Sequence, residues 1–216
     1  MIAWHWLGNI DYRLALRRQL AWREAVLAGT SAGALLLCEH PPVITLGRSA
    51  TTANVLTSTT ELAQAGIGVE RIERGGDVTY HGPGQLMVYP VVRVRSVIGL
   101  LETVANVIIE SLAQWGVADA QWRRDPAGIW VGDAKIAACG IHVARGVVTH
   151  GFAVNLATPA SAWRHIRPCG LSTPVISVVD ARTGHRFGVP SAAQAAIVVG
   201  PRLAAALPTV VRKAGG

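Results

Sequence analysis

The sequence predicts an α+β fold in a single domain of residues 1–216, and three observations carry this prediction. Apolar segments of strand length come mostly in hairpin-like groups, and helical patterns are inserted between these groups instead of following each strand in regular βαβ alternation. A length of 216 residues suits one domain with a full core. Half of the residues are hydrophobic and 15% are charged, which excludes a disordered chain.

The first third of the chain is expected to form strands around one long helix. Residues 4–7 are read as a strand, and Asp11 is placed to cap the helix that follows. Apolar spacing predicts that one face of this helix packs on the core (Tyr12, Leu16, Leu20, Arg23 through its stem, and Leu27). Residues 34–39 (ALLLCE) are a continuous apolar run typical of a buried strand, and a second strand is expected at 43–46.

The middle of the chain contains the clearest helix. Residues 99–115 carry apolar side chains at helical spacing (Leu101, Val104, Ile108, Leu112 and Trp115), and Gly116 is the expected stop. Before it, Ser58 is placed to cap a short helix that ends at Ala65, and strands are expected at 69–72 and 85–94.

The last part of the chain is expected to be rich in strands. Three of them are predicted at 128–131, 135–143 and 147–156, separated by Gly-Asp and Arg-Gly turns. A short helical turn is expected at 161–165, and the apolar run 175–179 is read as a strand that closes the sheet. An alanine-rich helix at 191–207 completes the prediction.

Composition limits the classes of binding partner and the cellular compartment that we expect for this chain. The formal charge of +7 favours an acidic partner, but the arginines are scattered and no helix carries a basic run, so nucleic acid and an acidic protein both stay open. The three cysteines have neither zinc nor disulfide spacing, which favours a reducing compartment. No secretory signal or membrane span is expected, and residues 12–27 are read as a core helix in preference to a transit peptide.

Two stretches draw attention to a site. The segment 74–90 (RGGDVTYHGPGQLMVYP) places four glycines around Thr79, Tyr80 and His81, which suits a wall where backbone approaches a ligand closely. By spacing alone, a tight hairpin at the Gly-Pro-Gly turn is the simpler interpretation. The second stretch holds Lys135, which is one of only two lysines among 20 basic residues. A buried lysine can lose its proton, whereas arginine cannot. Lys135 is therefore a candidate for a chemical role, and an ordinary exposed lysine on a strand is the alternative interpretation.

Cys169 differs from the other two cysteines. It lies between Pro168 and Gly170 on an expected turn, after Arg164, His165 and Arg167. Positive charge nearby lowers the pKa of a thiol, so Cys169 is a candidate nucleophile, and an ordinary surface thiol is the alternative.

Taken together, four blocks resemble the octanoyltransferases of lipoate biosynthesis. The blocks are RGGDVTYHGPGQLMVYP, GDAKIAACGIHV, THGFAVNL and HIRPCGL, in this order, and CEHPPVITLGR near the start also fits. The resemblance covers about residues 34–171. It implies the fold of biotin and lipoate protein ligases, an α+β domain with a central mixed β-sheet and flanking helices.

The resemblance also implies an activity. Such enzymes take an octanoyl group from octanoyl-acyl carrier protein, hold it as a cysteine thioester, and pass it to a lysine of a lipoyl domain. The acceptors are lipoyl domains of 2-oxoacid dehydrogenases and the glycine cleavage H protein. Both clients are typically acidic, which suits the positive charge. We expect no cofactor, no metal ion, no nucleic acid and no membrane as partner, and a cytoplasmic location.

The site residues follow from the resemblance by position. Cys169 matches the thioester cysteine, and Lys135 matches the lysine that lowers the pKa of that cysteine. Substrate-binding positions fall in three segments: Arg74, Gly75, Gly76, Asp77, Val78, Thr79, Tyr80 and His81; Ala138, Cys139 and Gly140; and Gly151, Phe152 and Ala153. Two residues depart from the family pattern: Cys139 stands where an aliphatic residue is common, and His142 where arginine is common.

Other interpretations stay open on the sequence. An ATP-dependent lipoate or biotin ligase on the same fold would need no thiol nucleophile, so it predicts that Cys169→Ala stays active. A binding module without chemistry predicts an ordinary thiol and no acyl-enzyme. Within the transferase reading, His81 is expected to shape the pocket and His150 to orient a strand or a partner group, and a Cys-His dyad is the less favoured scheme. The oxyanion is expected to be held by backbone N–H groups near Cys169, Gly140 or Gly76.

Overall fold

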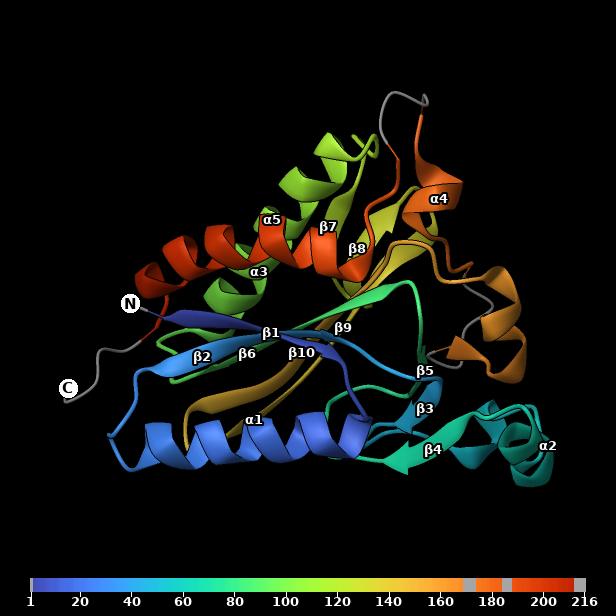
Figure 1. Cartoon of the computed structure of the whole chain (residues 1–216), viewed down its shortest axis with the longest axis horizontal. Coiled ribbons are helices and arrows are strands. Elements are labelled where there is room, and N and C mark those ends of the chain that lie inside the picture. The colour runs from blue at the N-terminus through green and yellow to red at the C-terminus, as the bar shows by residue number, and fades with distance from the viewer. Residues whose placement is uncertain (1, 169–173, 184–187, 212–216) are drawn as a thin grey trace.

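The computed structural model describes residues 2–168, 174–183 and 188–211, which form a seven-stranded sheet flanked by helices and a three-stranded sheet at one end (Figure 1). The helices are α1 Tyr12–Leu27, α2 Thr59–Gln64, α3 Val97–Gln114, α4 Val178–Ala181 and α5 Ala192–Ala206. The strands are β1 Ala3–Asn9, β2 Gly33–Glu39, β3 Val43–Leu46, β4 Gly68–Arg71, β5 Val78–His81, β6 Gln85–Val92, β7 Gln121–Arg124, β8 Ala127–Val131, β9 Ala134–Ala144 and β10 Val147–Asn155.

The large sheet is mixed. Its strand order is β1-β2-β6-β10-β9-β8-β7, with β1 and β2 parallel and the other neighbours antiparallel. The small sheet has the order β4-β3-β5, with one parallel and one antiparallel pair. This arrangement confirms the predicted α+β class with a central mixed sheet and flanking helices.

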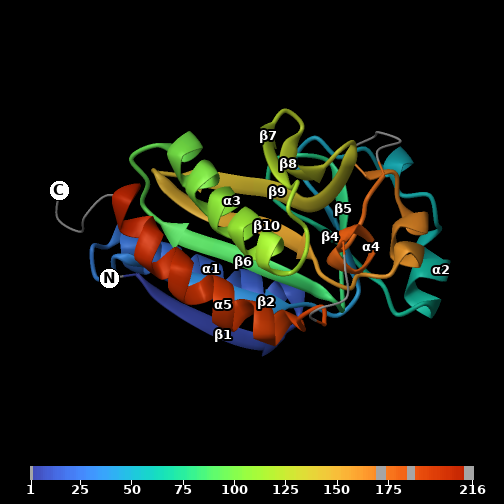
Figure 2. The same cartoon turned by 90° about the horizontal axis from the view of Figure 1, so that it is seen from above.

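The helices cover both faces of the large sheet. Helix α1 lies on one face, and α3 and α5 lie on the other (Figures 1 and 2). The central strands β6 and β10 are buried along their whole length, as their apolar sequences require. Among the described residues, α3 is long and apolar enough to span a membrane, and in this fold its apolar face packs against the sheet and α5.

Helix α1 begins as predicted, but its buried face differs from the prediction. Asp11 caps the helix by accepting a hydrogen bond from the N–H of Leu14 at 3.0 Å. The buried positions are Tyr12, Ala15, Gln19 and Val26, and the predicted leucines at 16, 20 and 27 are only half-buried. The cause is a polar contact that periodicity does not reveal: Gln19 Oε1 accepts a hydrogen bond from the backbone N–H of His150 at 2.7 Å. This bond turns a polar side chain toward the sheet.

The prediction of a closing strand at 175–179 was wrong. Val175 forms only an isolated bridge with Lys135, and residues 178–181 form α4. The carboxylate of Asp180 accepts hydrogen bonds from the N–H and the hydroxyl of Ser177, so a capping box outweighs the β-branched composition. The opposite error concerns β7, which carries the polar sequence QWRR and was not predicted because an exposed edge strand has little apolar signal.

The Gly82-Pro83-Gly84 turn is not the hairpin that its spacing favours. It joins β5 of the small sheet to β6 of the large sheet, and these two strands do not pair. Gly84 has a φ of +81°, and a Cβ there would lie 2.6 Å from the carbonyl carbon of Ala157. The glycine is therefore required where the chain crosses from one sheet to the other.

Candidate active site

A cavity of about 470 Å³ lies where the small sheet meets β9 and β10. Its walls come from both faces of the large sheet, since Tyr12 of α1 and Leu101 of α3 both line it. Of the predicted site residues, fourteen line the cavity: Arg74, Gly75, Gly76, Asp77, Val78, Thr79, His81, Lys135, Ala138, Cys139, Gly140, Gly151, Phe152 and Ala153. The fold thus brings the segment 74–81 together with the hairpin of β9 and β10, which lies far from it in the chain.

Tyr80 does not line the cavity, although it was predicted with its neighbours. Side chains alternate along β5, and Tyr80 points into a small apolar core, where its ring meets Trp163 edge-on at 5.8 Å between centroids. Its neighbours Thr79 and His81 point toward the cavity side. Tyr80 therefore supports the wall from behind instead of touching a substrate.

Cys169 lies outside the described residues, but the described residues on both sides of it reach this site. On one side Pro168 lines the cavity, and the N–H of Arg167 donates to the carbonyl of Asn54 at 2.8 Å. On the other side Val175 lines the cavity, and the carbonyl of Pro174 accepts a hydrogen bond from the N–H of Lys135 at 2.9 Å. The described residues that flank 169–173 thus reach the cavity on both sides.

Lys135 is buried at the start of β9, with 7% of its surface exposed. The pairing of β8 with β9 shifts register between Ile129 and Trp130, which places Trp130 opposite Lys135. The lysine Nζ lies 4.8 Å from the centroid of the Trp130 ring. A Cβ on Gly128 would lie 3.2 Å from Cε of Lys135 and 2.7 Å from the carbonyl oxygen of Ala137, so this glycine leaves room for the lysine stem.

The glycine-rich wall depends on close backbone approach. Gly75 donates its N–H to the carbonyl of Ile141 at 2.8 Å, which attaches the wall to β9. A Cβ on Gly140 would lie 2.9 Å from the carbonyl oxygen of Gly75, and one on Gly47 would lie 2.1 Å from that of Gly76. These glycines therefore allow the wall to lie directly against the neighbouring backbone, as the sequence pattern predicts.

Arg74 is a buried part of the wall, with 8% exposed. Its Nη2 donates to the carbonyl and the hydroxyl of Thr45 at 2.7 and 2.8 Å, its Nε donates to the same hydroxyl at 3.2 Å, and its Nη1 donates to the carbonyl of Gly75 at 3.1 Å. Such forked geometry is specific to a guanidinium. Arg74 thus fixes the wall to β3 and places a permanent positive charge beside the cavity.

His81 belongs to a buried hydrogen-bond network. Gln85 donates its amide N–H to Asn155 Oδ1 at 2.8 Å, so its amide oxygen faces His81 and accepts from Nδ1–H at 2.8 Å. The Nε2 atom then accepts from the Thr45 hydroxyl at 3.3 Å. Burial, reinforced by the charges of His40 and Arg74, holds the pKa of His81 well below its usual value. A neutral ring with both nitrogens engaged suits a structural part of the wall.

His150 adopts a left-handed backbone with φ of +60°, which is rare for a residue other than glycine. Its Nδ1 lies 3.3 Å from the hydroxyl of Tyr12, and its ring lines the cavity. Burial, with the charges of Arg74 and His142 as smaller causes, lowers the pKa of His150 to about 3. The ring is therefore neutral at physiological pH. Backbone strain of this kind clusters at functional sites.

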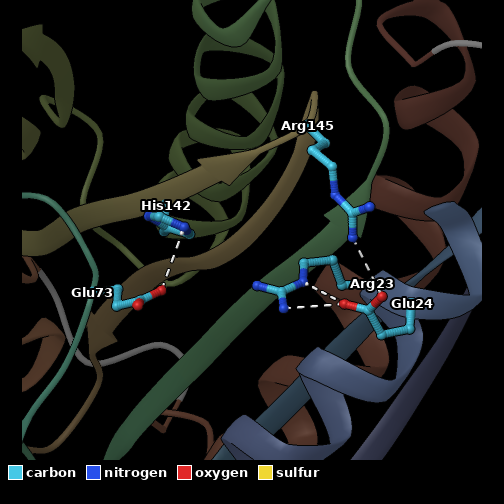
Figure 3. Close-up of polar contacts among 5 residues, drawn as sticks. All are labelled: Arg23, Glu24, Glu73, His142 and Arg145. Atoms are coloured by element: carbon cyan, nitrogen blue, oxygen red, sulfur yellow. Dashed lines mark hydrogen bonds and ion pairs between the residues drawn. The ribbon is translucent and has the colours of Figure 1, made fainter.

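The two departures from the family pattern occupy different environments. Cys139 lines the cavity, and burial raises the pKa of its thiol to about 12, so it is a small apolar lining residue and not a competing nucleophile. His142 is half-buried and does not line the cavity, and its Nε2 lies 3.5 Å from the carboxylate of Glu73 (Figure 3). Beside it, a shallow groove lined by Arg48, Ser49, His142 and Val143 shares Ser49, Gly75, Gly76 and Ile141 with the cavity.

Sequence reasoning missed several lining residues. Five of them lie inside the blocks already singled out: Met87, Tyr89, Ile141, Asn155 and Pro168. The others come from segments without a glycine-rich or cysteine signal: Tyr12, Ser49, Leu101, Asp125, Pro126, Ala127, Trp163 and Val175. Tyr12 was assigned to the core because its position fits the helical pattern. Among the described residues, no group of three or more His, Cys, Asp or Glu side chains is arranged to hold a metal ion.

Comparison with known proteins identifies the family. Residues 11–195 match the lipoyl protein ligase A/B catalytic domain. An octanoyltransferase from Solibacter usitatus is 44% identical over 176 residues, which are 80% of each chain. One from Alkaliphilus metalliredigens is 40% identical over 83% of this chain and 84% of its own.

Solved structures agree on the fold. A lipoate-protein ligase A bound with ATP has a TM-score of 0.73 and 18% identity, and covers 96% of this chain and 85% of its own. A lipoate protein ligase from T. acidophilum with bound lipoic acid has a TM-score of 0.69 and 15% identity, covering 96% and 86%. At these identities the solved structures establish the fold alone, whereas the sequence relatives and the family match establish that the chain belongs to the octanoyltransferase family and is an acyltransferase.

Proposed function

We propose that this chain, acting as a single domain, transfers an octanoyl group from octanoyl-acyl carrier protein to a lysine of a lipoyl domain through a thioester on Cys169. One observation carries the proposal: the buried amine of Lys135 and the described anchors on both sides of Cys169 belong to the same glycine-walled cavity. The sequence relatives that are 40–44% identical bear the name octanoyltransferase, which supports the same activity.

The first half of the reaction loads the enzyme. A free cysteine has a pKa of about 8.5, and a neighbouring ammonium favours its thiolate. We propose that the thiolate of Cys169 attacks the thioester carbonyl of the donor, that the bond from carbonyl carbon to pantetheine sulfur then breaks, and that the Lys135 ammonium protonates the departing sulfur. The products are an acyl-enzyme, a free pantetheine thiol and a neutral Lys135.

The second half transfers the acyl group. Neutral Lys135 takes a proton from the incoming lysine ammonium, and the free amine attacks the Cys169 thioester. The carbon–sulfur bond breaks, Cys169 leaves as a thiolate, and the nitrogen of the new amide releases a proton to solvent. The charged pair of thiolate and ammonium is thereby restored. Gly76 and Gly140 line the cavity and stay candidates, with the backbone near Cys169, for holding the oxyanion of each tetrahedral intermediate.

The wall residues are proposed to bind and shape the substrates. The N–H of Gly75 is used to attach the wall to β9, and the guanidinium of Arg74 is bonded to Thr45 and Gly75, so both position the wall. Because His81 and His150 are held neutral by burial, we assign them to shaping the cavity and not to proton transfer. The net charge of +7 supports acidic partner proteins. We propose that the donor is octanoyl-acyl carrier protein and that the acceptors are lipoyl domains of 2-oxoacid dehydrogenases and the glycine cleavage H protein. We also propose that the reaction takes place in the cytoplasm.

The test is intact-protein mass spectrometry after incubation with octanoyl-acyl carrier protein. The wild type should gain the mass of one octanoyl group, and the gain should disappear on treatment with hydroxylamine, which cleaves thioesters. Cys169→Ser should gain no octanoyl group that hydroxylamine removes. Cys139→Ser should gain and lose the group like the wild type. Adding a lipoyl domain should discharge the acyl-enzyme without ATP. A wild type that stays unmodified, or transfer that requires ATP and persists in Cys169→Ala, would refute the proposal in favour of ligase chemistry.

A further inference from the structure

We propose that Trp130 is a positioning residue for the Lys135 ammonium, and that its ring face holds the charged amine at the edge of the cavity. This inference rests on the proposed function, because it assigns Lys135 a part in both half-reactions. It goes further by naming a group that holds the Lys135 amine in place from one half-reaction to the next.

The geometry around Trp130 is well defined. The ring is buried with 4% exposed, and its Nε1–H donates to the carbonyl of Pro126 at 3.2 Å. Pro126 itself lines the cavity. The guanidinium carbon of Arg123 lies 5.0 Å from the same ring centroid, and Arg123 Nη2 donates to the carbonyl of Gly132 at 2.7 Å. The ring is thus fixed by its own donor and by packing against a neighbouring strand.

The strand register delivers Lys135 to this ring. The register shift between Ile129 and Trp130 makes Trp130 and Lys135 cross-strand partners, and cross-strand partners have adjacent side chains. The absence of a side chain at Gly128 lets the lysine stem run along β8, since a Cβ there would contact its Cδ and Cε at 3.3 and 3.2 Å. These features together bring Nζ to 4.8 Å from the ring centroid.

A ring face suits the proposed chemistry better than a carboxylate would. An aromatic face attracts an ammonium within about 6 Å, and this attraction becomes stronger as water is removed. It contains no atom that accepts the proton, so it stabilises the charged amine without competing for that proton. Lys135 has to give up its proton in one half-reaction and regain it in the other. A buried carboxylate partner would oppose the first of these steps by holding the ammonium in a strong charge-assisted pair.

The placement is tested by NMR on the full-length protein labelled with [13C]lysine. Only Lys135 and Lys213 contribute signals, and Lys213→Arg assigns them. An ε-methylene close to an indole face is shifted by the ring current, so the Lys135 signal should be displaced upfield from a free lysine. The displacement should vanish in Trp130→Leu and remain in part in Trp130→Phe. A Lys135 signal at the free-lysine position in the wild type would overturn the proposal.

The functional test compares the same variants with Trp115→Leu, which removes a half-buried tryptophan that does not line the cavity. Cation–π attraction in a desolvated site corresponds to about a thirtyfold effect. Alkylation of Cys169 by iodoacetamide at pH 7 should therefore fall about thirtyfold in Trp130→Leu. Single-turnover acyl transfer should fall by the same factor, with KM for the donor nearly unchanged. Trp130→Phe should recover most of both rates, and Trp115→Leu should lose neither.

Each outcome decides one claim. If the ring-current shift disappears in Trp130→Leu while alkylation and transfer stay at wild-type rates, the positioning role is refuted. If Trp130→Leu does not fold, Trp130→Phe decides, because loss of both rates in that folded variant contradicts a role that needs only a ring face. A wild type that shows the ring-current shift but never becomes octanoylated refutes the proposed transferase function instead, and alkylation then decides the effect of Trp130 on the thiol.

Discussion

Replacing Gly140 by alanine tests whether the glycine wall sets the shape of the cavity. The new Cβ would lie 2.9 Å from the carbonyl oxygen of Gly75 and 3.1 Å from Cδ of Arg74. Gly75 cannot retreat freely, because its N–H is bonded to Ile141, the next residue on the same strand as Gly140, and Arg74 is bonded to Thr45. Overpacking of this kind costs about 1–3 kcal/mol. For a chain of this length, that free energy corresponds to a fall in Tm of about 2–12 °C.

The same displacement should reduce activity beyond the loss of stability. Arg74 and Gly75 both line the cavity, so a shift of the wall changes where the donor carbonyl lies relative to the nucleophile. Misplacement by about 1 Å can cost 10²-fold, and a shift of a few tenths of an ångström is expected to cost about tenfold. Acyl-enzyme formation is measured in single turnover at 20 °C, where the variant stays folded, and Tm is measured by differential scanning fluorimetry. Gly188→Ala is the control, because apart from its chain neighbours no atom of the described residues lies within 4 Å of its Cβ position. Wild-type Tm and rate in Gly140→Ala would refute this account of the wall.

Three further predictions address proton transfer, pH and the buried network. Lys135→Arg keeps the positive charge, but an arginine cannot exchange its proton. Alkylation of Cys169 should therefore change less than about threefold, while turnover should fall about 10²–10⁴-fold. Equal losses of both rates would contradict the proposed proton transfer by Lys135. Burial lowers the pKa of His150 to about 3 in the folded chain, from near 6.5 in the unfolded chain. Its contribution to the free energy of unfolding is therefore fully present above pH 6.5 and is lost as the pH falls, by about 3 kcal/mol at pH 4.5. Urea denaturation should show this loss, and His150→Asn, which tolerates the left-handed backbone, should reduce it; an unchanged pH dependence would show that this ring is not buried as described. Gln85→Leu leaves buried groups on His81 and Asn155 without their partner and should cost about 2–4 kcal/mol of unfolding free energy by the same assay; a loss below about 0.5 kcal/mol would indicate that the network is dispensable.

The part of the fold that the sequence predicted is the part with a strong local signal. Helix α3 carries apolar residues at helical spacing over four turns, and the predicted stop at Gly116 follows it with a φ of +92°. The glycine-rich wall had a weaker local signal, because spacing alone favoured a hairpin and only the family resemblance favoured a wall. The structure contains the close backbone contacts that these glycines allow. Where local signals were weak or conflicting, as in β7 and α4, the elements were missed or assigned wrongly.

What the sequence did not predict depends on long-range polar contacts. The face of α1 that packs on the sheet is set by a hydrogen bond between Gln19 and His150, which are 131 residues apart. The lining role of Tyr12 and the neutral state of His81 likewise depend on which side chains the sheet brings together. Periodicity records the apolar contacts of an element, whereas a buried polar pair leaves no periodic trace in either segment.

One such set of polar contacts explains how two separate halves of the site keep their relative position. Arg74 in the glycine wall is bonded to Thr45, whose hydroxyl is bonded to His81, and the network continues through Gln85 to Asn155. Asn155 Nδ2 then donates to the carbonyl of Ile176 at 3.0 Å, and the N–H of Ile176 donates to the carbonyl of Lys135 at 3.0 Å. The backbone donor and acceptor of Ile176 are therefore both used to hold the chain just beyond the Cys169 segment, one by the wall network and one by the lysine itself. Since buried polar groups are costly to leave unpaired, this network opposes any movement of the wall away from Lys135.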